Sequence, residues 1–215
     1  FEVSSDAPVR DAEETVRIRP SQVERFATCP LQWFLVDSGG ARGDTSAASL
    51  GTAIHAVAEH HQEPDRAAMM EEFLTTYDLE QEASDWEREA LVRDVEQMID
   101  TLCDYLATSR DELRALAADG HDARALKEVS VRASSPPDAP GGPWTITGRV
   151  DRLEVLGGSA RVVDFKTGKS VPSKAEIGDD PQLLVYQLAV TDGQVLTDDP
   201  EDRLPPLQSA GAQIV

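Results

Sequence analysis

Cysteine is scarce in this sequence, and long apolar runs are missing from it. Two cysteines in 215 residues cannot form a disulfide framework, so we expect a protein of the reducing cytoplasm. No apolar run approaches the ~20 residues of a membrane span, and no charged-then-apolar signal pattern opens the chain. These shortages argue against a disulfide-stapled secreted scaffold and predict that the protein has no membrane partner.

Basic residues are also in short supply, with 20 Lys and Arg against 40 Asp and Glu and a net charge of −20. This balance argues against a free-standing nucleic-acid binder, which usually carries a basic surplus. The charges are unevenly distributed, however. Residues 59–128 contain 20 acidic and 7 basic residues, whereas residues 142–176 contain 4 acidic and 6 basic ones. The second segment is the only locally positive block, although a chance fluctuation on an acidic, solvated surface would give the same count.

The length suits one large domain with a substantial core, or one domain with a helical insertion. We interpret residues 1–18, which are polar, acidic and without periodicity, as a linker or disordered lead-in. Residues 19–215 form the domain, with a helical excursion over residues 62–125. Because the chain begins with Phe1 rather than Met, we expect a piece of a longer protein.

Capping boxes at Ser21–Glu24 and Ser84–Glu87 predict two helix starts. The first helix should end before Pro30, because proline disfavours helical geometry at the residue that precedes it. The second capping box opens the longest helix, whose apolar residues recur at helical spacing. This stripe consists of Trp86, Leu91, Val95, Met98, Ile99, Leu102 and Leu106.

Three more helices are expected: one from Gly51, one over Asp65–Asp78, and one from Asp180 and Pro181. The last is apolar nearly all round, which predicts burial. Strands are predicted at "LKEVSVRA", "WTITGRVDRLEVL", "ARVVDFKTG" and "GAQIV". The order of helices, three strands, helix and strand indicates an α/β domain.

Two of these strands form a hairpin with charges at positions where strands rarely carry them. Asp151 lies in the first strand, and Asp164, Phe165 and Lys166 follow one another in the second. Alternation along the strand points Asp164 and Lys166 the same way and Phe165 to the other face. A buried carboxylate needs a paired charge or a metal. The pattern therefore fits either a structural salt-bridge network or a hard divalent cation, with Lys166 near a water or a phosphate.

Four other polar residues favour the cation. Glu128 lies in an otherwise apolar strand, and His55 lies on a helix that can pack over the sheet, although His55 alone fits a surface or core histidine as well. Gln182 and Tyr186 are four residues apart on one face of a helix suited to burial, so their polar groups need partners.

The sequence resembles RecB-type nuclease domains of the PD-(D/E)XK, restriction-endonuclease-like superfamily. The motifs that carry the resemblance are "GTAIHAV", "GRVDRLE", "VVDFKTGK" and "QLLVYQL", in the order and approximate spacing of that family. The opening "RPSQVERFATCPLQWFL" also looks like the start of this domain in bacterial helicase–nucleases of the AddAB and AdnAB type. The resemblance implies a mixed sheet flanked by helices, with a helical insertion.

It also implies a metal-dependent deoxyribonuclease, an exonuclease on single strands, that works in DNA double-strand break repair and recombination. Carried over by position, His55, Asp151, Asp164 and the backbone carbonyl of Phe165 bind Mg²⁺ or Mn²⁺, with Glu128 as a further candidate ligand. Asp151 and Asp164 are also catalytic residues, and so is Lys166, which orients the attacking water or stabilises charge on the phosphate.

Under the same resemblance, Gln182, Tyr186 and Arg149 bind the DNA strand. The strand is then supplied by a helicase motor, which lies in the same chain or in a partner helicase–nuclease subunit. Such a motor also accounts for the acidic total, because basic residues near the site would then suffice to hold DNA. These residues are Arg149, Arg152, Lys166, Lys169 and Lys174.

Many domains of this family hold an iron–sulfur cluster through one early and three late cysteines. Cys29 matches the early position, but no cysteine follows Cys103, which we expect to be a small core residue. Either the C-terminal part is missing and a longer chain holds a [4Fe-4S] cluster, or this branch has none. Two alternatives to the nuclease stay open: a catalytically decayed scaffold that binds DNA, and a structural domain with a salt-bridged hairpin.

Overall fold

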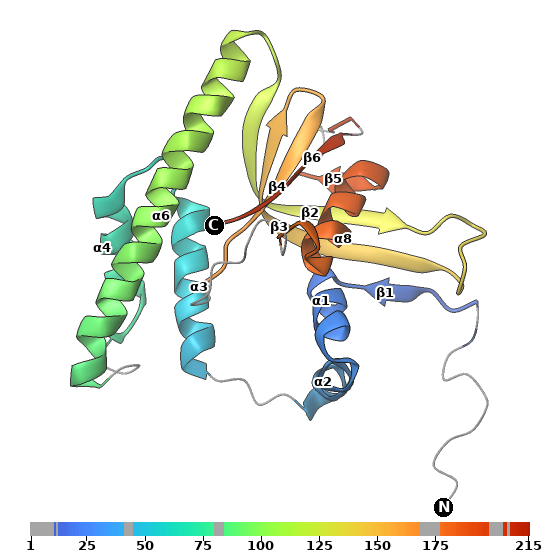
Figure 1. The fold of residues 1–215 in the computed structure, drawn as a ribbon, viewed down its shortest axis with the longest axis horizontal. Helices are drawn as coiled ribbons and strands as arrows, with labels where there is room; N and C mark the ends of the chain where they lie inside the picture. Colours follow the sequence, from blue (N-terminus) through green and yellow to red (C-terminus); the bar gives the residue numbers. More distant parts are fainter. Residues whose placement is uncertain are drawn as a thin grey trace, which may run out of the picture.

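The computed structural model describes residues 11, 13–40, 45–79, 84–167, 177–197, 204–205 and 207–215. In this part of the chain, a six-stranded mixed sheet is flanked by helices (Figure 1). The α/β class predicted from the sequence, a restriction-endonuclease-like mixed sheet with flanking helices, is confirmed.

The centre of the sheet is an antiparallel meander of β2 (Ala123–Ser134), β3 (Trp144–Leu156) and β4 (Ser159–Asp164). β5 (Gln194–Leu196) pairs antiparallel with β2, and β6 (Gln208–Ile214) pairs parallel with β4, which gives the order β5-β2-β3-β4-β6. β4 pairs only with the second half of β3. The first half of that edge instead pairs with β1 (Val16–Ile18) in parallel.

The turn between β3 and β4 explains why the two strands form a tight hairpin. Leu156 pairs with Ser159, so only Gly157 and Gly158 form the loop. Gly157 has φ 70°, in the left-handed region that short hairpin turns require and that glycine adopts without steric cost. The hairpin brings Asp151 and Asp164 onto neighbouring strands, as the sequence predicts.

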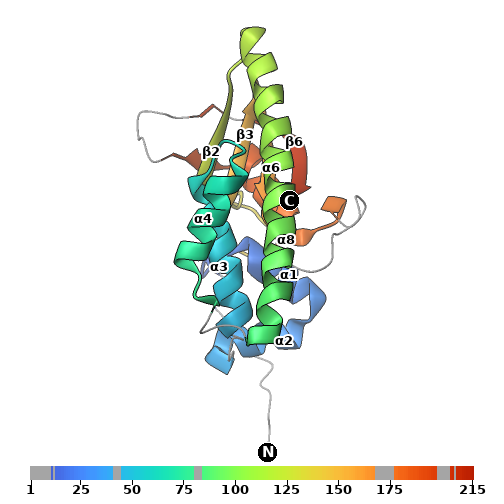
Figure 2. The same ribbon diagram turned by 90° about the vertical axis from the view of Figure 1, so that its left-hand side faces the viewer.

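Helices cover the sheet on both faces. α8 (Pro181–Asp192) packs on one face, near α1 (Pro20–Thr28) and α2 (Pro30–Leu35). The other face is covered by α3 (Thr45–His60), α4 (Arg66–Thr76) and α6 (Asp85–Ala118), which form a helical layer in front of the strands in Figure 2. A π-helical turn over Val36–Gly40 follows α2.

Each helical layer has its own hydrophobic core. The core under α8 combines that helix with the inner faces of β2, β3 and β4; its largest fully buried members are Val131, Val150, Leu153, Val155 and Leu183. The core of the other layer joins α3, α4 and α6 to the end of β4; it includes Val57, Met69, Phe73, Ile99, Leu106 and Val163. The sheet is therefore covered on both sides around the end of β4.

Side-chain caps fix several of the helix starts. Asp65 and Asp180 accept hydrogen bonds of 3.0 Å from the backbone N–H groups of Ala68 and Leu183, three residues into α4 and α8. Ser84 and Glu87 form the predicted capping box of α6. At α1 the predicted cap is off by two residues, because Arg19 is the N-cap and its N–H donates to the Gln22 side chain.

Some expectations about boundaries and burial are wrong. Val16–Ile18 belongs to the sheet rather than to a lead-in that reaches residue 18, and α3 begins at Thr45 rather than Gly51. The helical excursion ends before residue 125, since β2 starts at Ala123. Trp86 is exposed because it lies in the first turn of α6, away from the buried members of its stripe.

α8 is also less buried than its composition suggests. Leu184 and Leu188 are exposed on the side of the helix that faces away from the sheet. Cys103 is half-buried beside the core of α4 and α6, where its Sγ lies 3.6 Å from the Sδ of Met69. Among the described residues, no helix combines the length and the apolar character that crossing a membrane requires.

Candidate active site

Two central strands change phase in the middle of the sheet. Val150 and Leu153 both face the core under α8 although they are three residues apart in β3. Leu126 and Val129, also three apart, do the same in β2. Because regular strands alternate faces with a period of two, each strand must depart from regular geometry between these residues.

The departure falls where Glu128 lies opposite Asp151. Their flanking residues pair as Lys127 with Arg152 and Val129 with Val150. Glu128 has φ 49°, a left-handed conformation that is uncommon for any residue except glycine. Irregularities of this kind re-aim side chains and are common beside active sites. Asp151 is therefore at a point where the sheet itself is deformed.

Asp151 makes two contacts, one to each side. Its Oδ2 accepts a hydrogen bond of 2.8 Å from the backbone N–H of Phe165, and the same oxygen lies 3.6 Å from Nδ1 of His55 on α3. Burial raises the pKa of Asp151 to about 6, and the charge of Asp164 adds to the rise, while Phe165 and His55 oppose it. A carboxylate with this pKa is costly to keep charged without a further cation.

Asp164, Lys166 and Gln182 form a closed triangle of contacts at the end of β4. Lys166 Nζ lies 3.0 Å from Asp164 Oδ2, and it donates to Gln182 Oε1 at 3.1 Å. Gln182 Nε2 in turn donates to Asp164 Oδ1 at 3.2 Å. The prediction that Asp164 and Lys166 point the same way is confirmed, and Gln182 has the partners that its burial requires.

Burial and the ion pair between Asp164 and Lys166 together set the pKa values in this triangle. Burial raises the pKa of Asp164, which is 6% exposed, although the ammonium of Lys166 pulls it down. Burial would lower the pKa of Lys166, but Asp164 beside it holds that pKa above its usual value. Asp164 Oδ2 is buried and, apart from the ion pair with Lys166, accepts no aligned hydrogen bond within the described part of the chain.

The Tyr186 hydroxyl is hydrogen-bonded within the protein. Its hydroxyl donates a 2.7 Å hydrogen bond to the backbone carbonyl of Arg149, and burial raises its pKa to about 12. The ring lies against Gly148, where an added Cβ would be 2.8 Å from Tyr186 Cε1 and 3.0 Å from Pro20 Cγ. A glycine is therefore needed for α8 and the start of α1 to approach β3 this closely.

The Arg149 side chain projects outward and is 63% exposed. Its Nε donates to the Glu128 carboxylate at 2.6 Å and to the Glu128 backbone carbonyl at 3.1 Å. Glu128 is thus tied to Arg149, and the structure gives it no contact with Asp151 or Asp164 beyond its charge. Its role as a metal ligand, like that of the Phe165 carbonyl, stays a prediction.

The residues expected to hold a metal lie close together, but their side chains already have partners within the protein. Asp151 contacts the Phe165 N–H and His55, and Asp164 contacts Lys166 and Gln182. Within the described ranges, no three His, Cys, Asp or Glu side chains form a ready metal cluster. Mg²⁺, however, usually takes one or two protein carboxylates and completes its shell with water and substrate oxygens. Asp151 and Asp164 fit that requirement, because both have raised pKa values and Asp164 Oδ2 is a buried acceptor without a hydrogen bond.

One basic residue expected near DNA is placed elsewhere. Arg152 is buried and bonded to Glu154, so it cannot contact a substrate. Lys169 and Lys174 lie outside the described residues. Of the expected basic set, Arg149 and Lys166 are the ones that the structure places beside the candidate site.

The sequence reasoning missed a buried polar network around Glu154, which is fully buried in β3. Its carboxylate accepts hydrogen bonds from Tyr105 and Ser109 of α6, from Arg152 at 3.1 Å and from Arg161 at 2.8 Å. Burial would raise the pKa of Glu154, but these donors hold it below its usual value. The signal was available, since a glutamate within the strand "VDRLEVL" needs a partner.

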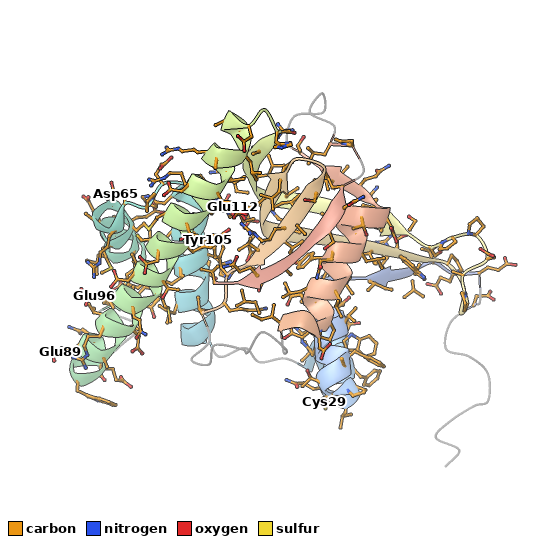
Figure 3. All side chains as sticks on the ribbon, turned by 45° about the horizontal axis from the view of Figure 1, so that its top comes forward. Cys29, Asp65, Glu89, Glu96, Tyr105 and Glu112 are labelled. Atoms are coloured by element: carbon orange, nitrogen blue, oxygen red, sulfur yellow. The ribbon has the colours of Figure 1, made fainter. Side chains whose placement is uncertain are left out.

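This network connects the helical layer to the candidate site. Figure 3 shows Tyr105 on the side of α6 that faces the sheet. Its ring packs edge-on against Phe165, with centroids 6.2 Å apart, and Phe165 packs against His55 at 6.5 Å. Arg152 also donates to Gln62, just after α3, at 2.7 Å. The position of His55 over Asp151 thus depends on how α3 and α6 sit on the sheet.

The two cysteines do not form a cluster site together. Cys29 lies between α1 and α2, as Figure 3 shows, whereas Cys103 lies on α6. An iron–sulfur cluster needs four ligands, so these two thiols alone do not fit one. A role for Cys29 as a cluster ligand stays a prediction.

Residues 17–212 match the PD-(D/E)XK nuclease superfamily, and the chain therefore belongs to that superfamily. No curated protein matches the chain at a significant level. Members of the superfamily are typically metal-dependent nucleases that use divalent metals such as Mg²⁺. Asp164, Phe165 and Lys166 spell the D-X-K of the superfamily's name, while Asp151 follows Val150 where the name has proline.

Proposed function

We propose that the chain hydrolyses phosphodiester bonds in DNA, with Asp151 and Asp164 holding a divalent cation. The observation that carries the proposal is the convergence of one buried carboxylate (Asp164), one partly buried carboxylate (Asp151) and one ammonium at the end of the hairpin, with Lys166 3.0 Å from Asp164. His55 and the Phe165 carbonyl complete the proposed ligands, and the imidazole would also suit Mn²⁺. A cation bound there would polarise a phosphoryl oxygen and lower the pKa of a water molecule.

The remaining residues position the catalytic groups and the DNA, and they stabilise negative charge on the phosphate. Lys166 supplies positive charge where the transition state accumulates negative charge on the phosphate. Gln182 bonds to both Asp164 and Lys166 and so fixes the distance between them. Tyr186 fixes the backbone of Arg149. The exposed Arg149 guanidinium, held by Glu128, is then placed to contact a phosphate beside the scissile one.

The finer assignment rests on the resemblance to RecB-type domains. We propose that the substrate is single-stranded DNA and that the chain acts as an exonuclease beside a helicase motor, in the repair of double-strand breaks. The net charge of −20 supports the proposal that a motor delivers the strand, because a surface this acidic attracts DNA poorly by itself.

Cleavage of end-labelled DNA by the purified chain tests the proposal. Single-stranded and duplex oligonucleotides are incubated with Mg²⁺, with Mn²⁺ and with a chelator, and the products are sized on a sequencing gel. We expect cleavage with either metal, none with the chelator, and faster loss of single strands. Products that shorten from one end indicate an exonuclease.

Two results would count against the proposal. Cleavage that continues in chelator would remove the cation from the mechanism. Binding of DNA without cleavage under any metal condition would favour the alternative of a scaffold that has lost catalysis. The intact pairing of Asp151, Asp164, Lys166 and His55 supports the enzyme over the scaffold.

A further inference from the structure

A groove with a volume of about 740 Å³ lies away from the candidate site, where β1 meets the first half of β3. Three arginines line it: Arg17 from β1, Arg19 just before α1, and Arg132 from β2. Here we name it the arginine groove. Figure 1 shows that β1 and the outer parts of β2 and β3 extend beyond α3 and α6, so the helical layer does not cover this part of the sheet.

These arginines differ from most other described arginines because they form no ion pair with a described acidic residue. Arg17, Arg19, Arg25 and Arg132 form no ion pair with a described residue, and all but Arg25 line the groove. In a chain with twice as many acidic as basic residues, unpaired arginines gathered in one groove indicate a site for an anion.

The acidic excess lies elsewhere. Figure 3 shows Asp65, Glu89 and Glu96 on the outer side of α4 and α6, away from the strands. Among the described residues that line the groove, Asp37 is the only acidic one, and its Oδ1 accepts a hydrogen bond of 2.7 Å from Gln22 Nε2. The charge of the molecule is therefore segregated, with a basic groove on an acidic protein.

The rest of the lining suits phosphate groups. Thr15, Thr145, Thr147 and Gln22 supply hydroxyl and amide groups beside the arginines. Arg, Thr and Gln side chains are among those that contact the phosphates and sugars of nucleic acids. A groove for an acidic peptide would need donors too, but a row of hydroxyls matched to guanidinium groups fits the repeated phosphates of a nucleic acid better.

The register of the sheet connects the groove to the candidate active site. Arg17 lies opposite Thr145 and Arg132 lies opposite Thr147. Thr145, Thr147 and Arg149 alternate along β3 on the face opposite the core under α8, and Asp151 follows two residues later. The distance from Thr147 to Asp151 is about 13 Å at about 3.3 Å per strand residue.

We infer that the arginine groove binds the phosphate backbone of the DNA strand and guides it along β3 toward Asp151 and Asp164. This inference rests on the proposed function, because it names the path by which a nuclease substrate reaches the site. Arg17, Arg19 and Arg132 contact phosphates several nucleotides from the scissile bond, and Arg149 makes the contact nearest to that bond. The groove reads no base sequence, since charge and hydroxyl contacts to phosphates carry none.

Binding of a fluorescein-labelled single-stranded oligonucleotide in chelator tests the inference without cleavage. Fluorescence anisotropy at low salt gives the Kd of the wild type and of Arg17→Ala, Arg132→Ala and the double variant. We expect each single variant to weaken binding roughly tenfold, the loss of one charge-assisted hydrogen bond. The slope of log K against log salt should fall in magnitude by about 0.7 for each phosphate contact removed.

Two matched variants sharpen the test. Arg93→Ala removes the same charge from the exposed face of α6 and should leave the Kd within about twofold, because a distant, screened charge contributes little. Asp37→Asn removes the acid from the groove and should tighten binding. Circular dichroism and melting temperature check that each variant is folded.

The outcomes separate the groove from the proposed function. Groove variants that bind DNA like the wild type, in a chain that cuts DNA with Mg²⁺, would overturn the groove alone. Groove variants that lose binding in a chain that cuts nothing would support the groove and overturn the nuclease. Equal competition by polyglutamate and by DNA of the same charge would show an acidic peptide site instead, and a wild type that does not bind DNA would also overturn the inference.

Discussion

The backbone N–H of Phe165 donates a hydrogen bond of 2.8 Å to Oδ2 of Asp151, across the hairpin from β4 to β3. The bond fixes one oxygen of Asp151 beside the D-X-K segment. It also keeps the Asp151 carboxylate close enough to Asp164 for the charge of Asp164 to raise the pKa of Asp151. In the described residues, Asp151 Oδ1 accepts no hydrogen bond. The hairpin thus presents one Asp151 oxygen to a cation, beside Asp164, whose Oδ2 pairs with the Lys166 ammonium.

The role of His55 can be tested by metal affinity. His55→Ala should lower the affinity for Mn²⁺ by at least the 10–100-fold that loss of an outer-shell partner costs. The fold should persist, because the side chain is 39% exposed and its packing contact is with Phe165. Isothermal titration with Mn²⁺ measures the affinity, and the melting temperature measures the fold.

His60→Ala is the matched control for this experiment. His60 lies at the end of the same helix and pairs with Glu72 at 2.6 Å instead of with the candidate site. Its loss should leave the affinity for Mn²⁺ unchanged. If His55→Ala also binds Mn²⁺ like the wild type, His55 is not a ligand.

The raised pKa of Asp151 predicts a pH dependence of stability. The folded-state pKa of about 6 lies above the ordinary aspartate pKa of 3.8, so the folded chain binds more protons between these pH values than the unfolded chain does. Stability measured in chelator should therefore fall as the pH rises from about 4 to about 6, by on the order of 3 kcal/mol. Asp151→Asn lacks this charge and should escape the loss.

Thermal melts of the wild type and Asp151→Asn across this range make the comparison. The advantage of the variant should grow from pH 4 to pH 6 and then stay constant. Asp94→Asn, on the exposed surface of α6, should show no such growth. Added Mg²⁺ should restore the wild type above pH 6 and leave Asp151→Asn unaffected. A variant advantage that does not depend on pH would contradict this account of Asp151.

The Glu154 network should be the polar feature on which stability depends most. Glu154→Gln removes the counter-ion of Arg152, which is 4% exposed, and part of that of Arg161. Loss of one partner of a buried pair costs about 3–5 kcal/mol. Urea denaturation should show a loss of this size, together with weaker metal binding, because α6 and α3 carry the packing around Phe165 and His55.

Glu112→Gln serves as the control for the network. Glu112 is the second, half-exposed partner of Arg161, at 2.6 Å. Exposed ion pairs contribute about 0–1 kcal/mol, so the loss here should be small. Equal effects of the two substitutions would show that the burial of Glu154 does not determine how much it contributes to the free energy of unfolding.

Several elements were predictable because their signals are local. The alternating run of β3, closed by Gly157 and Gly158, gave a strand with the predicted ends, Trp144 and Leu156. The capping box at Ser84 placed the start of α6. The position of Lys166 beside Asp164 follows from the alternation of an extended backbone, which continues past β4 where the Lys166 N–H donates to the Val215 carbonyl at 2.9 Å.

Other features depend on contacts that no local pattern encodes. β1 has only three residues, too few for a periodic signal, and it forms because the first half of β3 has an open edge. The phase change that places Asp151 depends on the left-handed backbone of Glu128, which its side chain does not suggest. Arg152 was expected near DNA, yet pairing with Glu154 buries it, and only the three-dimensional structure shows which basic residues remain exposed.

Paired substitutions of Asp164 and Lys166 test the central claim most directly. Asp164→Asn keeps the shape but removes a charge that holds the cation, so metal affinity and cleavage should both fall. Lys166→Met removes only the ammonium, so metal should still bind, while cleavage should fall by about 10²–10³-fold, as for a lost oxyanion donor. Melting temperature, Mn²⁺ affinity and cleavage of labelled single-stranded DNA are measured on both variants. The account predicts this separation of metal binding from cleavage; loss of stability in both variants, with metal-dependent cleavage unchanged, would show that the pair is only a structural salt bridge.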